Sequence, residues 1–333
     1  MCRAALLMFM ALMGLQVIAL PLRAQPAAVD PLMALRDSVV AVQSRAVEDA
    51  RSNATLGRNR FGSGVVIDTD GHILTIGYLV IESEQVDVTL PTGATYPAKV
   101  VGFDHATGFA LLKPILPIKL KPISVGSSSA LADQELMIVL PFEGLGPGAA
   151  TQLVSRRPFA GSWEYLLESP IYTFPPSAAW AGAALLNEKG ELVGIGSLFV
   201  RDAVAPGVYS PGNLFVPIDL LKPIQADLIA QGRRTTRVNP WLGVTTDDSS
   251  GYVAVLRVSQ DGPAYRAGMR TGDFITAVAG SEVRTLLDLY RKAWSLGGAG
   301  TQIPVEVERE GRRFPMLIES IDRTEFFKKP AGL

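Results

Sequence analysis

The stretch that decides the fold reads Gly62-Ser63-Gly64-Val65-Val66-Ile67, then Asp68-Thr69-Asp70-Gly71, then His72-Ile73-Leu74-Thr75. Its two apolar, β-branched runs are typical of short strands, and the Asp and Gly residues between them favour a tight turn. The pattern continues further along the chain, because apolar runs separated by Gly and Pro recur at 86–90, 96–101, 109–112 and 136–140. Many short strands at regular spacing predict a β-barrel or a β-sandwich.

The pattern changes in the last third of the chain. Asp219 is predicted to cap a helix over 220–231 that ends at Gly232, and the polar, basic residues 233–239 are predicted to form a linker. After Trp241 a new mixture begins, with strands expected at 241–245, 252–258 and 273–278, helices at 263–267 and 285–295, and a closing hairpin over 303–319. A length of 333 residues also favours about two domains.

Composition excludes some classes of function. The formal net charge is −1, so there is no electrostatic reason to expect nucleic acid as a partner. The chain has one cysteine, Cys2, which lies in the first 24 residues. If those residues are removed, the mature chain has no disulfide, no thiol nucleophile and no zinc–thiolate site. We therefore expect no metal site and no cofactor.

The first 24 residues are typical of a secretory signal peptide. Arg3 gives a short positive start, 4–20 is apolar except for Gly14 and Gln16, and Ala24 offers a small residue at the cleavage point. The segment therefore predicts an exported, periplasmic protein. The alternative is an uncleaved segment that anchors the chain in the membrane.

Several motifs together resemble HtrA/Deg-type serine proteases. The run 61–67 with 71–75 resembles the opening of their trypsin-like domain, and 104–113 resembles the segment around their catalytic aspartate. The run 185–195 resembles their strand pair after the nucleophile, and 217–221 resembles the end of that domain. The runs 241–244 and 262–275 resemble their PDZ domain. The resemblance covers roughly 35–320 and implies a mainly β fold: a trypsin-like double six-stranded β-barrel followed by a smaller α+β PDZ domain.

The three triad positions implied by this resemblance hold unsuitable residues. The histidine position is Tyr78, the aspartate position is Gly108 and the serine position, within Ala179–Leu185, is Ala181. A Ser-His-Asp triad needs a nucleophile, a base and a group that fixes the base, and a hydrocarbon can fill none of these roles. A phenol with an ordinary pKa near 10 is a poor general base at neutral pH. We therefore expect no catalytic residues here and an inactive homologue rather than an enzyme.

Two alternatives concern the same region. The first alternative is a triad built elsewhere from Ser177 with His72 or His105, although both histidines are expected to be surface residues of turns or strands. Trp180 replaces a small polar residue and either fills the former substrate pocket or packs in the core. Ala179 replaces the glycine that shapes the oxyanion hole in the resembled family, so that hole is also expected to be altered.

The remaining hypothesis is peptide binding. By resemblance, backbone N–H groups of Trp241, Leu242, Gly243 and Val244 would hold a peptide's terminal carboxylate, and Gly243 would let the backbone approach closely. The far wall of the groove would carry three side chains from 285–295, namely Leu286, Leu289 and Tyr290, although these residues could instead pack the domain core.

These observations predict four segments: a signal peptide at 1–24, a trypsin-like domain at 35–232, a linker at 233–239 and a PDZ domain at 240–322. The expected function is that of an exported pseudoprotease, which binds peptides or unfolded proteins as a chaperone-like factor or a regulator. Two alternatives are an active serine endopeptidase with a non-standard site and a purely structural subunit. Expected partners are peptides, unfolded proteins and, in a homo- or hetero-oligomer, further copies or an HtrA-type relative.

Overall fold

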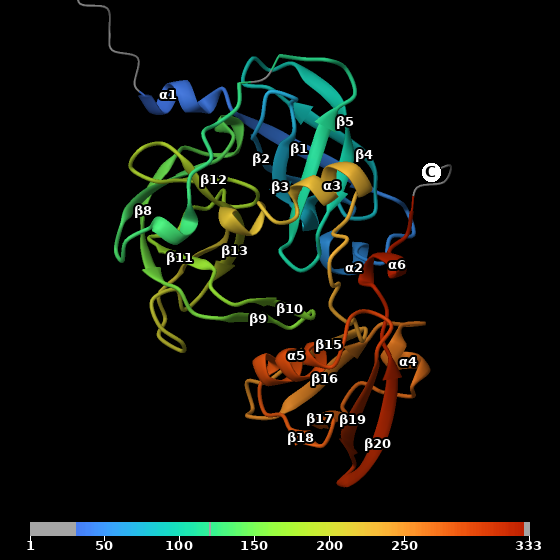
Figure 1. Cartoon of the computed structure of the whole chain (residues 1–333). Helices are drawn as coiled ribbons and strands as arrows, with labels where there is room; N and C mark the ends of the chain where they lie inside the picture. The colour runs from blue at the N-terminus through green and yellow to red at the C-terminus, as the bar shows by residue number, and fades with distance from the viewer. Residues whose placement is uncertain (1–30, 120, 330–333) are drawn as a thin grey trace, which may run out of the picture.

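The computed structural model describes residues 31–119 and 121–329, and the 1–24 segment lies outside that range. In the described residues the chain forms two closed barrels of six strands each, and a third, smaller unit follows them (Figure 1). The expectation of a mainly β fold with two six-stranded barrels and a following α+β unit is confirmed.

The first barrel contains the stretch quoted at the start. A short helix, α1 (Pro31–Arg36), precedes it, and its strands follow the order β1-β2-β3-β6-β5-β4 around the barrel. All neighbouring pairs are antiparallel, and Val65 of β2 pairs with Leu74 of β3. The strands are β1 (Val39–Ala46), β2 (Asn59–Val66), β3 (Ile73–Ile76), β4 (Ser83–Thr89), β5 (Thr95–Phe103) and β6 (Phe109–Pro114).

The second barrel follows the order β11-β14-β13-β12-β7-β8. Its strands are β7 (Leu136–Leu140), β8 (Ala149–Ser155), β11 (Ile171–Phe174), β12 (Ala184–Leu186), β13 (Leu192–Val200) and β14 (Gly212–Pro217). Between β8 and β11 the chain leaves the barrel as a hairpin of two short strands, β9 (Phe159–Gly161) and β10 (Tyr165–Leu167). Figure 1 shows this hairpin extending from the second barrel toward the third unit.

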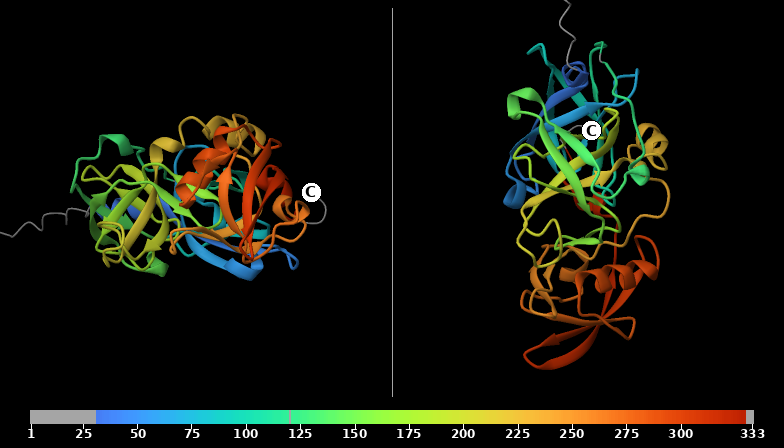
Figure 2. Two further views of the ribbon diagram at one scale, coloured as in Figure 1. Left: turned by 90° about the horizontal axis from the view of Figure 1, so that it is seen from below. Right: turned by 90° about the vertical axis from the view of Figure 1, so that its left-hand side faces the viewer.

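The third unit is a sheet in the order β15-β16-β17-β19-β20, with β18 paired to β17. Strand β15 lies at one edge of that sheet, and helix α5 (Leu286–Ser295) contacts β9, β10 and β17. The right-hand view of Figure 2 shows the unit at one end of the molecule, below the two barrels. The remaining elements are β15 (Val244–Asp247), β16 (Val253–Val258), α4 (Pro263–Arg266), β17 (Phe274–Val278), β18 (Ser281–Glu282), β19 (Gln302–Arg309), β20 (Arg312–Glu319) and α6 (Arg323–Phe326).

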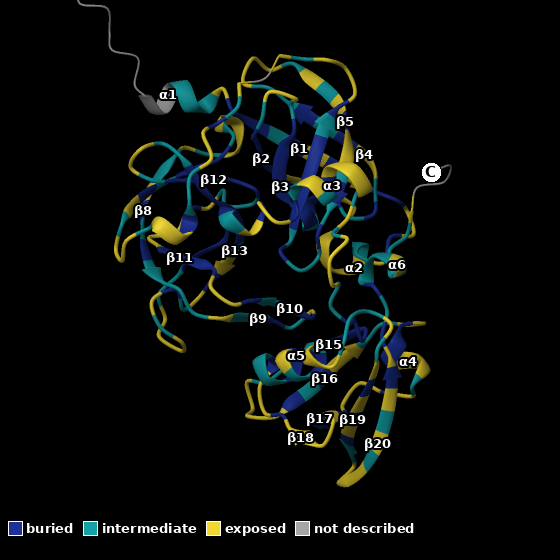
Figure 3. Cartoon of the chain, viewed as in Figure 1, coloured by how far each residue is buried: buried dark blue, intermediate teal, exposed yellow. Residues whose placement is uncertain are grey.

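Apolar periodicity explains these elements. In β19 the residues alternate between exposed and buried, as expected for a strand with one face on the core. In α5 the side chain of Thr285 accepts a hydrogen bond from the N–H of Asp288, which caps the helix, and the buried residues recur at helical spacing. Figure 3 shows that barrel strands such as β3 and β13 are largely buried, whereas the turn that joins β19 to β20 is exposed.

Residues 45–60 contain regular structure, since β1 extends to Ala46 and a short helix, α2 (Asn53–Leu56), lies within them. The predicted helix after Asp219 needs correction. Asp219 does not cap a helix over 220–231: the chain makes a single 3₁₀ turn over Ile218–Leu220, and helix α3 begins only at Gln225 (Gln225–Gln231). Pro223 explains the break, because proline disfavours helical backbone in the residue before it.

Asp219 has a different role. Its carboxylate accepts hydrogen bonds from the N–H of Ser129 (2.8 Å) and from the hydroxyl of Ser127 (3.0 Å), so it fastens a loop of the second barrel. The predicted end of α3 is correct: Gly232 has the left-handed backbone of a helix C-cap and donates its N–H to Leu228. Within the described residues, no helix is both long and apolar enough to cross a membrane.

Candidate functional site

The fold brings the three triad-like positions together at the junction of the two barrels. Tyr78 lies in a 3₁₀ turn, Gly77–Leu79, directly after β3, and the N–H of Gly77 donates to the carbonyl of Gly108 at 2.6 Å. The carbonyl of Ala181 accepts the N–H of Ser63 at 2.8 Å, which ties the second barrel to β2 of the first. The predicted positions therefore share one site, although their side chains differ from those of a triad.

Tyr78 acts as a structural donor in this site. Its hydroxyl donates to the carbonyl of Ser197 at 3.0 Å. Burial raises the pKa of Tyr78 above its ordinary value, and a side-chain hydrogen bond with Trp180 only partly opposes that shift. The phenol therefore stays protonated at neutral pH, and its proton is already used in a hydrogen bond.

Gly108 is held in place by the motif that surrounds it. Asp104 accepts the N–H and the hydroxyl of Thr107 (2.9 and 2.7 Å) and pairs with Nε and Nη2 of Arg234 (3.0 and 2.9 Å). Gly108 then has a φ of +80°, and a Cβ there would lie 3.1 Å from the hydroxyl oxygen of Tyr165. The Asp104-x-x-Thr107 pattern thus builds a turn, and Arg234 of the expected linker closes it.

Trp180 lies next to the serine-like position. It is half-buried, and its ring lies 5.8 Å from the exposed ring of Phe199, tilted by 44°. One of the N–H groups that would shape an oxyanion hole, that of Ala179, points to the hydroxyl oxygen of Ser177 at 3.4 Å. The N–H of Ala179 is therefore already engaged within the loop.

The second proposed triad is not brought together. Ser177 is buried, with its backbone N–H and carbonyl both bonded to Asn213 (2.7 and 3.2 Å). His72 pairs through Nδ1 with Asp68 (2.7 Å), and His105 faces Arg323, with 2.8 Å between Nε2 and Nη1. Among the described residues no hydrogen bond joins a histidine to a serine hydroxyl. The expectation that both histidines are surface residues is wrong for His72, which is buried.

One cluster in the described residues has the ligand types of a cation site. Asp68, Asp70 and His72 lie in the turn between β2 and β3, with one possible ligand atom from each residue within 4.8 Å of the others. Asp68 also accepts the N–H of His72 at 3.0 Å, so the cluster has an ordinary role in shaping that turn.

The predicted carboxylate-binding loop holds a carboxylate from the same chain. The N–H groups of Leu242, Gly243 and Val244 all donate to Glu164, at 2.7, 2.7 and 2.9 Å. Gly243 has a φ of +85°, which lets successive N–H groups point to one side. The fourth predicted residue, Trp241, instead exchanges backbone hydrogen bonds with Ile321. Glu164 lies at the tip of the β9–β10 hairpin, and sequence analysis did not single it out.

The predicted far wall of the groove is partly core and partly contact surface. Leu286 and Leu289 are buried among the apolar residues of the third unit, so they pack its core. Tyr290 is buried too, but its hydroxyl donates to the carbonyl of Gly161 (2.6 Å) and accepts the N–H of Glu164 (3.1 Å). Helix α5 therefore contacts the hairpin through the side on which the groove wall was predicted.

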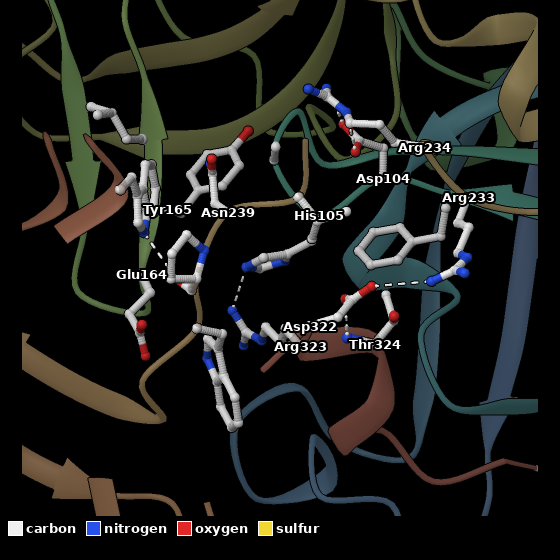
Figure 4. A pocket seen from close by; sticks show the side chains of 17 residues that line it. Asp104, His105, Glu164, Tyr165, Arg233, Arg234, Asn239, Asp322, Arg323 and Thr324 are labelled. Carbon is white, nitrogen blue, oxygen red and sulfur yellow. Dashed lines mark hydrogen bonds and ion pairs between the residues drawn. The ribbon is translucent and has the colours of Figure 1, made fainter. Parts of the chain in front are cut away.

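Charged groups surround Glu164. Burial raises the pKa of Glu164 to about 7, against the opposing effects of the three N–H donors and of Arg323. Burial also lowers the pKa of Arg323 to about 10 and that of His105 well below its ordinary value. Figure 4 shows His105 and Arg323 pointing toward each other in the pocket that these residues line, a cavity of about 30 Å³.

Comparison with protein families supports the two-part reading. Residues 62–195 match the family described as trypsin-like peptidase domain, and residues 240–316 match the family described as PDZ domain. The two barrels therefore form a trypsin-like peptidase domain, and the third unit is a PDZ domain.

Curated relatives are named as serine endoproteases. The "Probable periplasmic serine endoprotease DegP-like" of Chlamydia trachomatis is 29% identical over 280 residues, which cover 78% of this chain and 54% of that protein. "Serine endoprotease DegS" of Haemophilus influenzae is 29% identical over 266 residues, 74% of this chain and 73% of that protein. The chain thus spans about half the length of its DegP-like relatives.

Solved structures also share the fold. The "HtrA-type protease AlgW with tripeptide" is 21% identical with a TM-score of 0.51, and covers 89% of this chain and 95% of its own. A serine endoprotease from Yersinia pestis is 26% identical with a TM-score of 0.50, and covers 86% of this chain and 95% of its own.

These names correct one expectation. The chain was expected to be no enzyme because Tyr78, Gly108 and Ala181 occupy the triad-like positions. The relatives with the same domain order are named as endoproteases, and this finding contradicts that expectation. A methyl group at Ala181 cannot attack a carbonyl, so the physical requirement for peptidase activity here is a nucleophile at another position.

Proposed function

We propose that this chain binds the ends of unfolded or damaged proteins outside the cytoplasm. It joins a trypsin-like peptidase domain to a PDZ domain, as its HtrA/Deg-type relatives do. The observation that carries this proposal is the convergence of three consecutive N–H groups, from Leu242, Gly243 and Val244, on one carboxylate. A peptide's C-terminal carboxylate offers the same two oxygens to the same donors. Relatives that are named as periplasmic endoproteases support a periplasmic location.

The test compares two forms of one peptide. A decapeptide with an apolar last residue and a free carboxylate should bind the full chain, and the same peptide with an amidated C-terminus should bind at least tenfold more weakly, because the amide removes the charge that the loop binds. Equal affinity for both forms would remove the proposed recognition. Val244→Pro, which deletes one donor N–H, gives a control for the loop itself.

Binding of this kind would serve a chaperone-like holder or a regulator. Light scattering of a denatured substrate protein, with and without the chain, measures the holding role. The molar mass in solution, measured for the chain alone and mixed with an HtrA-type relative, separates a regulator that joins a relative from a subunit that only completes an oligomer. A chain that neither suppresses aggregation nor associates with a relative would leave both roles without support.

The second candidate function is serine endopeptidase activity from a non-standard site. The names of the relatives favour it. Ser177 is the hydroxyl nearest in sequence to Ala181, and its Oγ is bonded to the N–H of Ala179. Turnover of a denatured protein, together with labelling by a serine-reactive phosphonate that Ser177→Ala abolishes, would support this candidate. Labelling that persists in Ser177→Ala would assign the activity to another residue.

A further inference from the structure

The tip of the β9–β10 hairpin lies against the PDZ domain in the manner of a bound peptide. Strand β15 is an edge strand of the PDZ sheet, and the N–H of Thr246 in that strand donates to the carbonyl of Ser162 at 2.9 Å. On the other side, the hydroxyl of Tyr290 in α5 bonds to Gly161 and to Glu164. The tip thus occupies the space between sheet edge and helix where peptides add to such domains.

The side chain of Glu164 takes the place of a peptide's terminal carboxylate in this arrangement. Both of its carboxylate oxygens are engaged, Oε2 by Leu242 and Oε1 by Gly243 and Val244, and the residue is only 3% exposed. Glu164 also has a φ of +60°, a left-handed backbone that side chains rarely adopt. The tip therefore holds an unfavourable local conformation that is compensated by the contacts of its carboxylate.

Apolar contacts reinforce the position of the tip. Ala160 and Leu166, which lie on either side of it in β9 and β10, pack against the core of the PDZ domain. Arg323, at the start of α6, donates to the carbonyl of Trp163 at 2.8 Å. The exposed ion pair between Glu168 and Arg291 of α5 adds a contact at the rim.

We propose that Glu164 is an internal ligand of the PDZ domain, which keeps the carboxylate loop and its groove closed until the C-terminal carboxylate of a partner polypeptide displaces it. This inference rests on the proposed function, since it needs the loop to bind carboxylates in trans. A tethered group has an effective concentration in the millimolar range, so a partner must bind the open loop tightly in order to compete.

Displacement would reach the peptidase domain through the next residue. Tyr165 follows Glu164 directly, and its hydroxyl donates to the carbonyl of Thr107 at 2.7 Å, beside Gly108. Its ring stacks on Trp163, with centroids 5.9 Å apart. Release of the tip would therefore alter the support of the turn at the aspartate-like position, Gly108.

The experiment measures binding of a fluorescent decapeptide that ends in valine, as the free acid and as the amide, to the full chain by anisotropy. Three proteins are compared: the unmodified chain, Glu164→Ala, and Glu188→Gln, which changes an exposed acidic residue in the turn between β12 and β13. We expect Glu164→Ala to bind the free acid at least tenfold more tightly than the other two, because the internal competitor is gone. Equal affinity in all three proteins would overturn the proposal.

A second measurement keeps the result clear if the chosen peptide does not bind. Hydrogen–deuterium exchange of the segment 241–246 should be slow in the unmodified chain and in Glu188→Gln, and at least tenfold faster in Glu164→Ala. Fast exchange in the variant without peptide binding would support the internal contact and remove the proposed function. Unchanged exchange would overturn the internal contact, whatever the peptide does.

Discussion

The carboxylate of Glu164 accepts the N–H of Gly243 at 2.7 Å, and this bond joins the β9–β10 hairpin of the peptidase domain to the carboxylate loop of the PDZ domain. The two residues are far apart in the sequence, and the bond is buried. It therefore links the position of the hairpin in the peptidase domain to the occupancy of the carboxylate loop in the PDZ domain.

The first prediction concerns pH. Burial raises the pKa of Glu164 to about 7 from an ordinary value of 4.5, so the docked tip binds a proton that the released tip does not. Docking is therefore most favourable at low pH and weakens as the pH rises from about 4.5 through about 7. The carboxylate of the free peptide stays ionised across this range.

Peptide affinity should accordingly rise on the order of tenfold between pH 5.5 and pH 7.5 in the unmodified chain. The neighbouring titratable groups should not reverse the effect: Arg323 stays charged, and His105 and Tyr290 stay neutral, because burial lowers the pKa of His105 and raises that of Tyr290. Anisotropy titrations at both pH values measure the change in peptide affinity, with Glu164→Ala as the control. A rise of the same size in that variant would assign the pH dependence to another group.

The second prediction concerns Tyr290. Tyr290→Phe removes the hydroxyl that bonds to the carbonyl of Gly161 and the N–H of Glu164, so both buried groups lose this partner. The docked state should lose about 1–3 kcal/mol, so peptide affinity should increase. Leu289→Met is the control, because it changes a neighbouring buried side chain without touching the hairpin bonds. A Tyr290→Phe chain with unaltered peptide affinity would argue against the role of this hydroxyl.

The third prediction concerns Gly108. Gly108→Ala should lower the stability of the peptidase domain by about 1–3 kcal/mol, because alanine is strained at a φ of +80° and its Cβ would press on the hydroxyl of Tyr165. Gly207→Ala is a matched control, since Gly207 has a φ of +72° and open space around its Cβ position. Urea denaturation followed by tryptophan fluorescence compares the two, and equal losses would show that the contact with Tyr165 has no cost.

The fourth prediction concerns Ala181. In Ala181→Ser the new hydroxyl would lie in the site that contains Tyr78, whose raised pKa and hydrogen bond to Ser197 make it unable to take a proton at neutral pH. The new serine should therefore not react with a phosphonate probe. Mass spectrometry of the labelled chain locates any adduct, and one on residue 181 would mean that a base is present which the observed contacts do not include.

The fold could be predicted from the sequence because strand periodicity and turn residues are local signals. The barrel strands, the C-cap at Gly232 and the helix cap at Thr285 all follow from neighbouring residues. The helix after Asp219 was wrongly predicted because the preference of Pro223 against helical backbone outweighed a favourable cap. His72 was wrongly placed on the surface because its burial depends on the packing of two strands and on Asp68.

The site was only partly predictable for a related reason. The carboxylate loop could be placed through its motif, but its occupant comes from about 80 residues earlier in the chain. The one local signal was an acidic residue among the aromatic residues of a short hairpin, Trp163-Glu164-Tyr165. That pattern fits an exposed turn equally well, and only the docking of the two domains turns Glu164 into a ligand.

The most direct test of this account is the amide proton of Gly243, observed by NMR in the full chain. We predict a strongly downfield shift in the unmodified chain, an upfield move in Glu164→Ala, and a return downfield when the variant receives the free-acid peptide but not the amidated one. A Gly243 resonance that is the same in the unmodified chain and in Glu164→Ala would contradict the account.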